Sequence, residues 1–166
     1  KHPIILAGLY PPANSRRDAQ HENKTSTYIT RVMGHSNYDW IDIFPYSPAR
    51  NSEIDQNELK KMLMSDDGEA HRHDWFKRIQ KRVEVLYTNN NHHPVIYLCG
   101  DTINCVVKKM SDQFHAVKCQ SLMLGLYTCK IGSIDCVVLL DHPHPSAHLM
   151  ARGEANARHR FVQSMR

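Results

Sequence analysis

The sequence predicts an α/β protein, a three-layer α/β/α domain with a central four-stranded parallel sheet. Three observations predict this class. Several short apolar runs have the length of strands, amphipathic helical patterns separate them, and the longest run ends abruptly in a loop of His, Pro and Ser. Strand–helix alternation favours right-handed parallel crossovers. At 166 residues the chain has the length of one domain, which we expect to span residues 1–166.

The predicted strands are short apolar runs ended by Gly, Pro or charged residues. The last of them delivers a polar loop at its carboxyl end, and in open α/β sheets that edge is where ligands bind. The predicted strands are Ile4 to Ala7, Trp40 to Phe44, Val95 to Cys99, and Ile134 to Leu140.

The predicted helices have apolar residues at spacings of three and four, which form one stripe along a helix. Ser52 can cap the second of these helices, with Asp55 three residues on. The stripes cover Tyr28 to Met33, Ile54 to Leu63, Trp75 to Tyr87, Ile103 to Met110, and Phe161 to Met165.

Two segments lack such a pattern. The polar tract Ser65 to Arg72 is expected to be a solvated loop between two helices. The segment His115 to Ile131 is compatible with helix, strand or both.

Composition bounds the class of protein. No apolar run approaches the roughly 20 residues of a membrane span, and the apolar part of the first residues is too short for a signal peptide. The net charge of +4 is compatible with a nucleic-acid partner. The 5 cysteines include no Cys-x-x-Cys pair, which predicts reduced thiols in an intracellular compartment, nucleus or cytoplasm, and argues against a structural zinc or iron–sulfur site built from them. We expect no cofactor.

Three strand ends carry residues suited to chemistry. Gly8, after the first strand, permits a tight turn or close approach of a ligand. Asp42 interrupts an apolar strand, where an acid is costly unless it is paired or faces a wet pocket; a surface-facing strand end is the alternative. After the third strand, Gly100 turns the chain, and Asp101 or Thr102 can cap the following helix.

Together the loops bring Tyr10, Asp42, Phe44 and His144 towards one rim of the predicted sheet. These four side chains are suited to a pocket that binds a flat polar ring. Phe44 can stack on such a ring, and Asp42 can accept from an exocyclic amine or ring N–H. His144 can donate to a carbonyl oxygen. Enzymes that act on a base within DNA extrude it into a pocket of this kind.

The motifs resemble the uracil-DNA glycosylase superfamily. The tripeptide His144-Pro145-Ser146 follows the last strand, as the His-Pro-Ser motif of that family does. A Gly-x-x-Pro loop after the first strand and an apolar-Gly turn before a helix occur in the same order. The stretch Asp42 to Pro45 is similar to the Asn-Leu-Phe-Pro type of its single-strand-selective and uncharacterised branches.

The resemblance implies a role for each matching residue. The histidine of His-Pro-Ser stabilises the departing base anion, an aromatic residue stacks on the base, and an apolar side chain fills the gap left in the duplex. Carried onto this chain, it assigns catalysis to His144, Tyr10 and Asn14; base binding to Gly8, Leu9, Asp42 and Phe44; and DNA contacts to Ser146, His148, Leu149, Met150 and Arg152.

Two positions depart from the family pattern. Tyr10 stands where the family has its water-activating Asp or Asn, and a phenol keeps its proton at neutral pH. Asn14, Asp18 or Asp101 can replace the missing base. Asp42 stands in place of the base-reading Asn, and an ionised carboxylate only accepts hydrogen bonds, so it suits the amino group of cytosine better than a carbonyl of uracil.

The resemblance therefore implies a monomeric DNA glycosylase, acting in DNA repair or modification, that flips uracil, cytosine or a modified pyrimidine and hydrolyses its N-glycosidic bond. Two alternatives stay open. The fold can be a catalytically inactive module that binds nucleic acid, a nucleobase or nucleotide, or a protein. His142, His144 and His148 can also be ligands of a hydrolytic metal, although Pro143 and Pro145 exclude a regular helix that presents all three.

Overall fold

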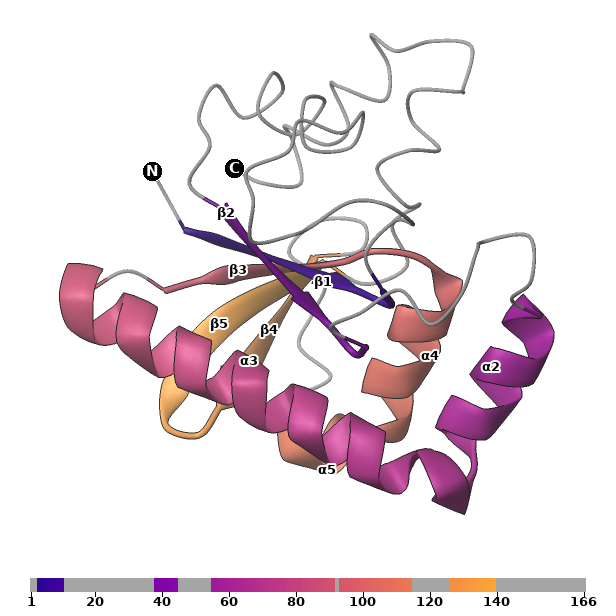
Figure 1. Ribbon diagram of the computed structural model, residues 1–166. Helices are drawn as coiled ribbons and strands as arrows, with labels where there is room; N and C mark the ends of the chain where they lie inside the picture. Colours follow the sequence, from indigo (N-terminus) through magenta and orange to yellow (C-terminus); the bar gives the residue numbers. More distant parts are fainter. Residues whose placement is uncertain (1–2, 11–37, 45–54, 92, 115–125, 140–166) are drawn as a thin grey trace, which may run out of the picture.

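The protein contains a five-stranded mixed sheet, which confirms the α/β class (Figure 1). This computed structural model describes residues 3–10, 38–44, 55–91, 93–114 and 126–139. The strand order is β2-β1-β3-β5-β4. The strands are β1 (Ile4–Gly8), β2 (Tyr38–Asp42), β3 (Val95–Leu98), β4 (Leu126–Ile131) and β5 (Ile134–Leu139).

The sheet corrects the prediction of four parallel strands. The pairs β1–β2, β1–β3 and β3–β5 are parallel, but β4 is a fifth strand that pairs antiparallel with β5. β4 and β5 form a hairpin around Gly132, whose φ of 61° is easily adopted by glycine. The sequence pattern of 115–131 left this strand unassigned, because its apolar residues are interrupted by Thr128 and Lys130.

The described helices are α2 (Gln56–Met64), the 3₁₀ turn η2 (Asp66–Gly68), α3 (Glu69–Asn90), α4 (Asp101–Lys109) and α5 (Ser111–Phe114). In Figure 1, α3, α4 and α5 lie below the sheet, and α2 lies beside α4. The helices predicted over 28–33 and 161–165 lie outside the described residues. The described part of the chain therefore shows helices on one face of the sheet.

The helix α2 begins one turn later than the sequence indicated. Its N-cap is Asp55, whose Oδ1 accepts hydrogen bonds from the backbone N–H groups of Asn57 (3.0 Å) and Glu58 (3.2 Å). An aspartate in this position satisfies amides that have no partner within the helix. Ser52, the predicted cap, lies outside the described residues.

The segment predicted as a solvated loop, 65–72, is instead a tight corner between helices. It consists of η2 and the first turn of α3, and Arg72 in it is buried. The Arg72 guanidinium donates to the backbone carbonyls of Leu63 (2.6 Å) and Ser65 (2.7 Å). The prediction failed because the carbonyls at the end of α2 need donors, and Arg72 supplies them.

The core lies between the sheet and its helices. Ile5, Ala7, Ile96 and Leu98 of the central strands face the apolar stripe of α3, which includes Trp75. The alternate residues of these strands are also buried, as is typical of central parallel strands. No helix among the described residues has the length and apolar character that crossing a membrane requires.

Three side chains of α3 hold the edge strand β2. The Trp75 indole N–H donates to the carbonyl of Ile41 (3.1 Å). The Arg78 guanidinium donates to the carbonyls of the next two residues, Asp42 and Ile43. Arg82 pairs with the Asp39 carboxylate. Their spacings of three and four place them on one face of the helix, so a single helix face contacts β2 from near its start to its carboxyl end.

Candidate functional site

A pocket of about 450 Å³ lies at the carboxyl ends of β1 and β3. The chain passes from β1 to β2 on one side and returns to β3 on the other side of β1, so this edge is a topological switch point. Ligands of open α/β sheets bind at such points, and the volume is in the usual range for small-molecule sites. The lining residues are Gly8, Leu9, Tyr10, Gln56, Asn57, Lys60, Cys99, Gly100, Asp101, Thr102 and Ile103.

The turn from β3 into α4 forms one wall of the pocket. Gly100 is the N-cap residue and has a φ of 100°, a conformation that glycine adopts without strain. The side-chain amide of Asn104 donates from Nδ2 to the Gly100 carbonyl at 2.7 Å. The sequence predicted that Asp101 or Thr102 would cap α4; in fact both lie inside the helix, and no side chain makes the cap hydrogen bond. Their side chains line the pocket instead.

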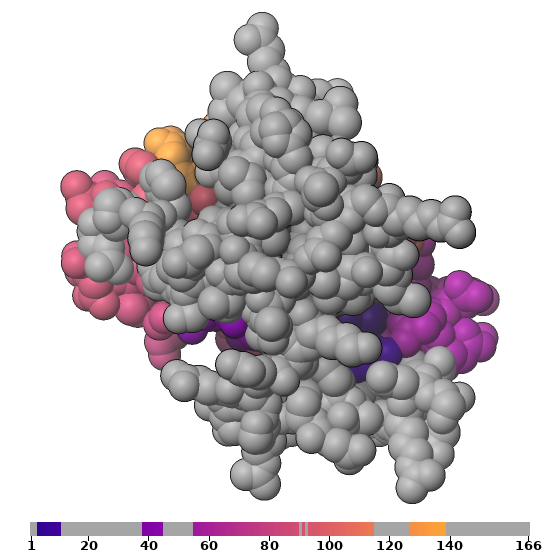
Figure 2. Space-filling view, turned by 90° about the horizontal axis from the view of Figure 1, so that it is seen from above, coloured from indigo at the N-terminus to yellow at the C-terminus, as the bar shows by residue number. Residues whose placement is uncertain are grey.

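The opposite wall comes from the first turns of α2. The amide of Gln56 donates a hydrogen bond to the Tyr10 hydroxyl, which joins the loop after β1 to this helix. In the view of Figure 2, indigo atoms of the β1 segment lie next to magenta atoms of the α2 segment. The Tyr10 side chain is therefore positioned by α2 at the edge of the pocket.

An ion pair joins the two walls. Lys60 of α2 donates from Nζ to Oδ2 of Asp101 at 2.6 Å. The hydrogen bond to Asp101 raises the pKa of Lys60 above its usual range. Asp101 is the single carboxylate among the described residues that line the pocket, and its side chain is 77% exposed. The pocket thus holds an anionic oxygen that solvent reaches, next to an ammonium that stays charged at neutral pH.

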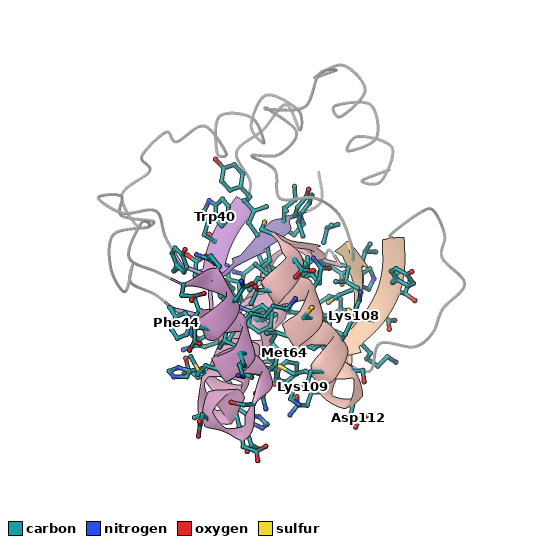
Figure 3. The ribbon with its side chains drawn as sticks, turned by 90° about the vertical axis from the view of Figure 1, so that its right-hand side faces the viewer. Trp40, Phe44, Met64, Lys108, Lys109 and Asp112 are labelled. Carbon is teal, nitrogen blue, oxygen red and sulfur yellow. The ribbon has the colours of Figure 1, made fainter. Side chains whose placement is uncertain are left out.

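The structure brings some predicted site residues together and not others. Gly8, Leu9 and Tyr10 line the pocket, whereas Asp42 and Phe44 do not. Asp42 is 4% exposed, and its carboxylate lies against Gly8 on the neighbouring strand. Phe44, labelled in Figure 3, packs edge-on against His71, with ring centroids 5.0 Å apart. The base-binding roles of these two residues stay predictions.

The other predicted site residues lie outside the described residues. They are Asn14, Asp18, His142, His144, Ser146, His148, Leu149, Met150 and Arg152. The strand β5, which precedes His142 to Arg152 in the sequence, runs parallel to β3 and pairs Leu139 with Tyr97. The carboxyl end of β5 therefore lies at the same edge of the sheet as the pocket. Within the described ranges, no three His, Cys, Asp or Glu side chains gather as a metal site requires.

The sequence pattern singles out neither Gln56 nor Lys60. Both fall within the helix predicted over 54–63, outside its apolar positions. Their spacing of four places them on one side of α2, but the same spacing is normal for a solvated face. Only the packing of α2 beside α4 shows that this side meets the ends of β1 and β3.

Comparisons with protein-family models, with curated proteins and with solved structures find no match to this chain.

Proposed function

We propose that the protein is a DNA glycosylase-like enzyme that binds a flipped pyrimidine and hydrolyses its N-glycosidic bond. The observation that carries this proposal is the pocket at the switch point, because the loop after β1 that resembles the glycosylase motif lines it. This edge is also the one from which β5 leads towards His144. Four residues lie between Leu139 and His144, so the two residues are at most about 18 Å apart along an extended chain.

The lining suits a nucleobase. Gln56 and Asn57 carry amides, and Tyr10 and Thr102 carry hydroxyls. Amides and hydroxyls both donate and accept hydrogen bonds, as the edges of pyrimidines require. Leu9 and Ile103 supply apolar surface, and a base that leaves the stack needs such surface for its ring.

The proposed chemistry divides between the loops. His144 and the backbone amides of its loop take up negative charge on the departing base, and one well-placed donor of this kind lowers a barrier by about 3 kcal/mol. Water attacks the anomeric carbon of the sugar through an oxocarbenium-like transition state. The target is uracil, cytosine or a modified pyrimidine, in DNA repair or DNA modification.

A second candidate is a non-catalytic module of the same fold that binds nucleic acid, a nucleobase or a nucleotide. The contact between Tyr10 and Gln56 favours it, because the position that carries the family's water-activating acid is occupied by a phenol bonded to a helix. Such a module binds in the same pocket but releases no base.

The test is a cleavage assay on labelled single- and double-stranded oligonucleotides that each carry one test base: uracil, cytosine, thymine, hypoxanthine or hydroxymethylcytosine. Alkali converts abasic sites to strand breaks. We expect base release by the wild-type protein, its collapse in His144→Ala, and its retention in His73→Ala, an exposed histidine of α3. Tight binding of an oligonucleotide without release at high protein concentration supports the binding module instead.

A further inference from the structure

We propose that Asp101 is the catalytic residue that positions and deprotonates the attacking water, and that Lys60 is the positioning residue that orients its carboxylate. This inference rests on the proposed glycosylase function. It follows from the juxtaposition, in one pocket, of the Tyr10 loop, the Asp101 carboxylate and the Lys60 ammonium.

The chemistry requires an acceptor for the water proton, and the loop after β1 does not supply it within the described residues. Gly8, Leu9 and Tyr10 contain no carboxylate. Asp42 is buried beneath Gly8 and does not line the pocket. Asp101 remains as the single carboxylate among the described lining residues, and it lines the pocket together with Tyr10.

The surroundings of Asp101 suit a general base. Its Oδ2 accepts the hydrogen bond from Lys60, which leaves lone pairs of Oδ1 available to water. The thiol of Cys105 lies 4.0 Å from Oδ1, the distance of a weak sulfur hydrogen bond. Asp101 is the first residue of α4, where the helix dipole favours an anion. Its high exposure lets water reach it.

The step balances as a hydrolysis. The water oxygen forms a bond to the anomeric carbon while the bond from that carbon to the base nitrogen breaks. The bonding electron pair leaves with the base, the water proton passes to Oδ1 of Asp101, and the base anion takes a proton from solvent.

A purely structural role is the competing explanation, since the Lys60–Asp101 pair also links α2 to α4. The two roles differ in their readouts. A structural link supports stability and not the rate at saturating substrate. A general base supports the rate, is lost in acid, and can be replaced by a small carboxylate from solution.

The experiment measures single-turnover base release by the wild-type protein, Asp101→Asn, Asp101→Ala, Lys60→Met and Lys60→Arg, on the preferred oligonucleotide of the panel. The matched control is Asp112→Asn, an exposed acid beyond the other end of α4 (Figure 3). Binding of the same oligonucleotide and thermal unfolding are followed for each variant.

We expect Asp101→Asn to lower the rate by about 100-fold or more, in the range of general-base catalysis, with binding and unfolding little changed. Formate should restore release by Asp101→Ala in a concentration-dependent way, and Asp101→Asn should lose the fall in rate that the wild-type protein shows in acid. Lys60→Met should lower the rate less, by about 10-fold, and Lys60→Arg should retain it because the charge is kept.

A rate for Asp101→Asn within threefold of the wild-type and Asp112→Asn rates overturns the inference and leaves the glycosylase function standing. If Asp101→Asn does not fold, Lys60→Met and Lys60→Arg decide, since equal rates for these two overturn the positioning role. If the wild-type protein releases no base from any oligonucleotide, the proposed function is refuted, and the role of Asp101 is refuted together with it.

Discussion

The carboxylate of Asp42 lies directly across the α-carbon of Gly8, its partner in the parallel register of β1 and β2. A β-carbon on Gly8 would fall closer to Oδ1 of Asp42 than real side chains approach, and 3.4 Å from its Cγ. The backbone of Gly8 is not in the left-handed region. The neighbouring carboxylate, and not the backbone conformation of residue 8, therefore favours glycine here.

The first prediction concerns Gly8→Ala. We expect the added methyl group to force Asp42 and the end of β2 apart and to lower the free energy of unfolding by about 1–3 kcal/mol, as overpacking does. Urea unfolding of Gly8→Ala, Asp42→Ala and the double variant measures this. In the Asp42→Ala background the alanine at position 8 should cost much less, because the obstacle is gone. Equal costs in the two backgrounds would show that Asp42 is not the cause.

Much of the fold follows from the sequence because its central strands are continuous apolar runs. The runs ending at Ala7, Cys99 and Leu140 fall on observed strands within a residue or so. The stripe from Trp75 to Tyr87 falls within α3. Continuous apolar runs and apolar stripes arise because these residues are buried, so they can be identified from the local sequence alone. β4 escaped prediction because an edge strand with one exposed face mixes apolar and polar residues.

The strand β2 shows why its boundaries were harder to predict. The predicted strand included Ile43 and Phe44, but β2 begins earlier, at Tyr38, and ends at Asp42. The backbone N–H groups of Ile43 and Phe44 still donate to the last residue of β1 and to the residue that follows it. The carboxyl end of β2 accepts hydrogen bonds from side chains of α3 that lie more than 30 residues away along the chain. No local pattern contains that information.

The candidate site was predicted in part. The sequence placed the loop after β1 at a ligand-binding edge, and the pocket lies there. It did not place Lys60 beside Asp101, because the packing of α2 on α4 brings together residues 41 positions apart. Asp101, one of three residues that the sequence offers for positioning water, lines the pocket, whereas Asn14 and Asp18 lie outside the described residues.

A second prediction tests the attachment of β2 to α3. Arg78 donates to the carbonyls of Asp42 (2.7 Å) and Ile43 (2.9 Å) and also pairs with Asp74 at 3.0 Å. Arg78→Met should lower the free energy of unfolding by about 2 kcal/mol, because charged donors to two carbonyls are lost. Asp74→Ala, which removes only the exposed ion pair, should cost about 0.5 kcal/mol or less. Similar losses in the two urea titrations would contradict a role for the carbonyls.

A third prediction concerns thiol reactivity. Cys129 and Cys136 face each other across the β4–β5 hairpin, and both are buried. The neighbouring Cys129 thiol, together with burial, raises the pKa of Cys136, so this thiol stays protonated and unreactive at neutral pH. Cys105 is partly exposed. Iodoacetamide followed by peptide mass spectrometry should modify Cys105 in the native protein, and Cys129 and Cys136 only in denaturant. Native modification of Cys136 at the rate of Cys105 would be inconsistent with the hairpin.

The last prediction concerns the charge of Lys60 and its dependence on pH. Its hydrogen bond to Asp101 raises the pKa of Lys60 above the ordinary value of 10.5. A raised pKa in the folded state means that the Lys60–Asp101 pair stabilises the fold fully below the ordinary lysine pKa. That contribution is lost as the pH rises through the raised pKa.

A titration of the Lys60 ¹³Cε chemical shift reports this directly. The midpoint should lie above 10.5 in the wild-type protein and fall towards that value in Asp101→Asn. Asp112→Asn changes the protein charge equally, so it should leave the Lys60 midpoint where it is. A common midpoint for the wild-type protein and Asp101→Asn would mean that the pair does not persist in solution. The carboxylate proposed to position water would then lack the partner that orients it.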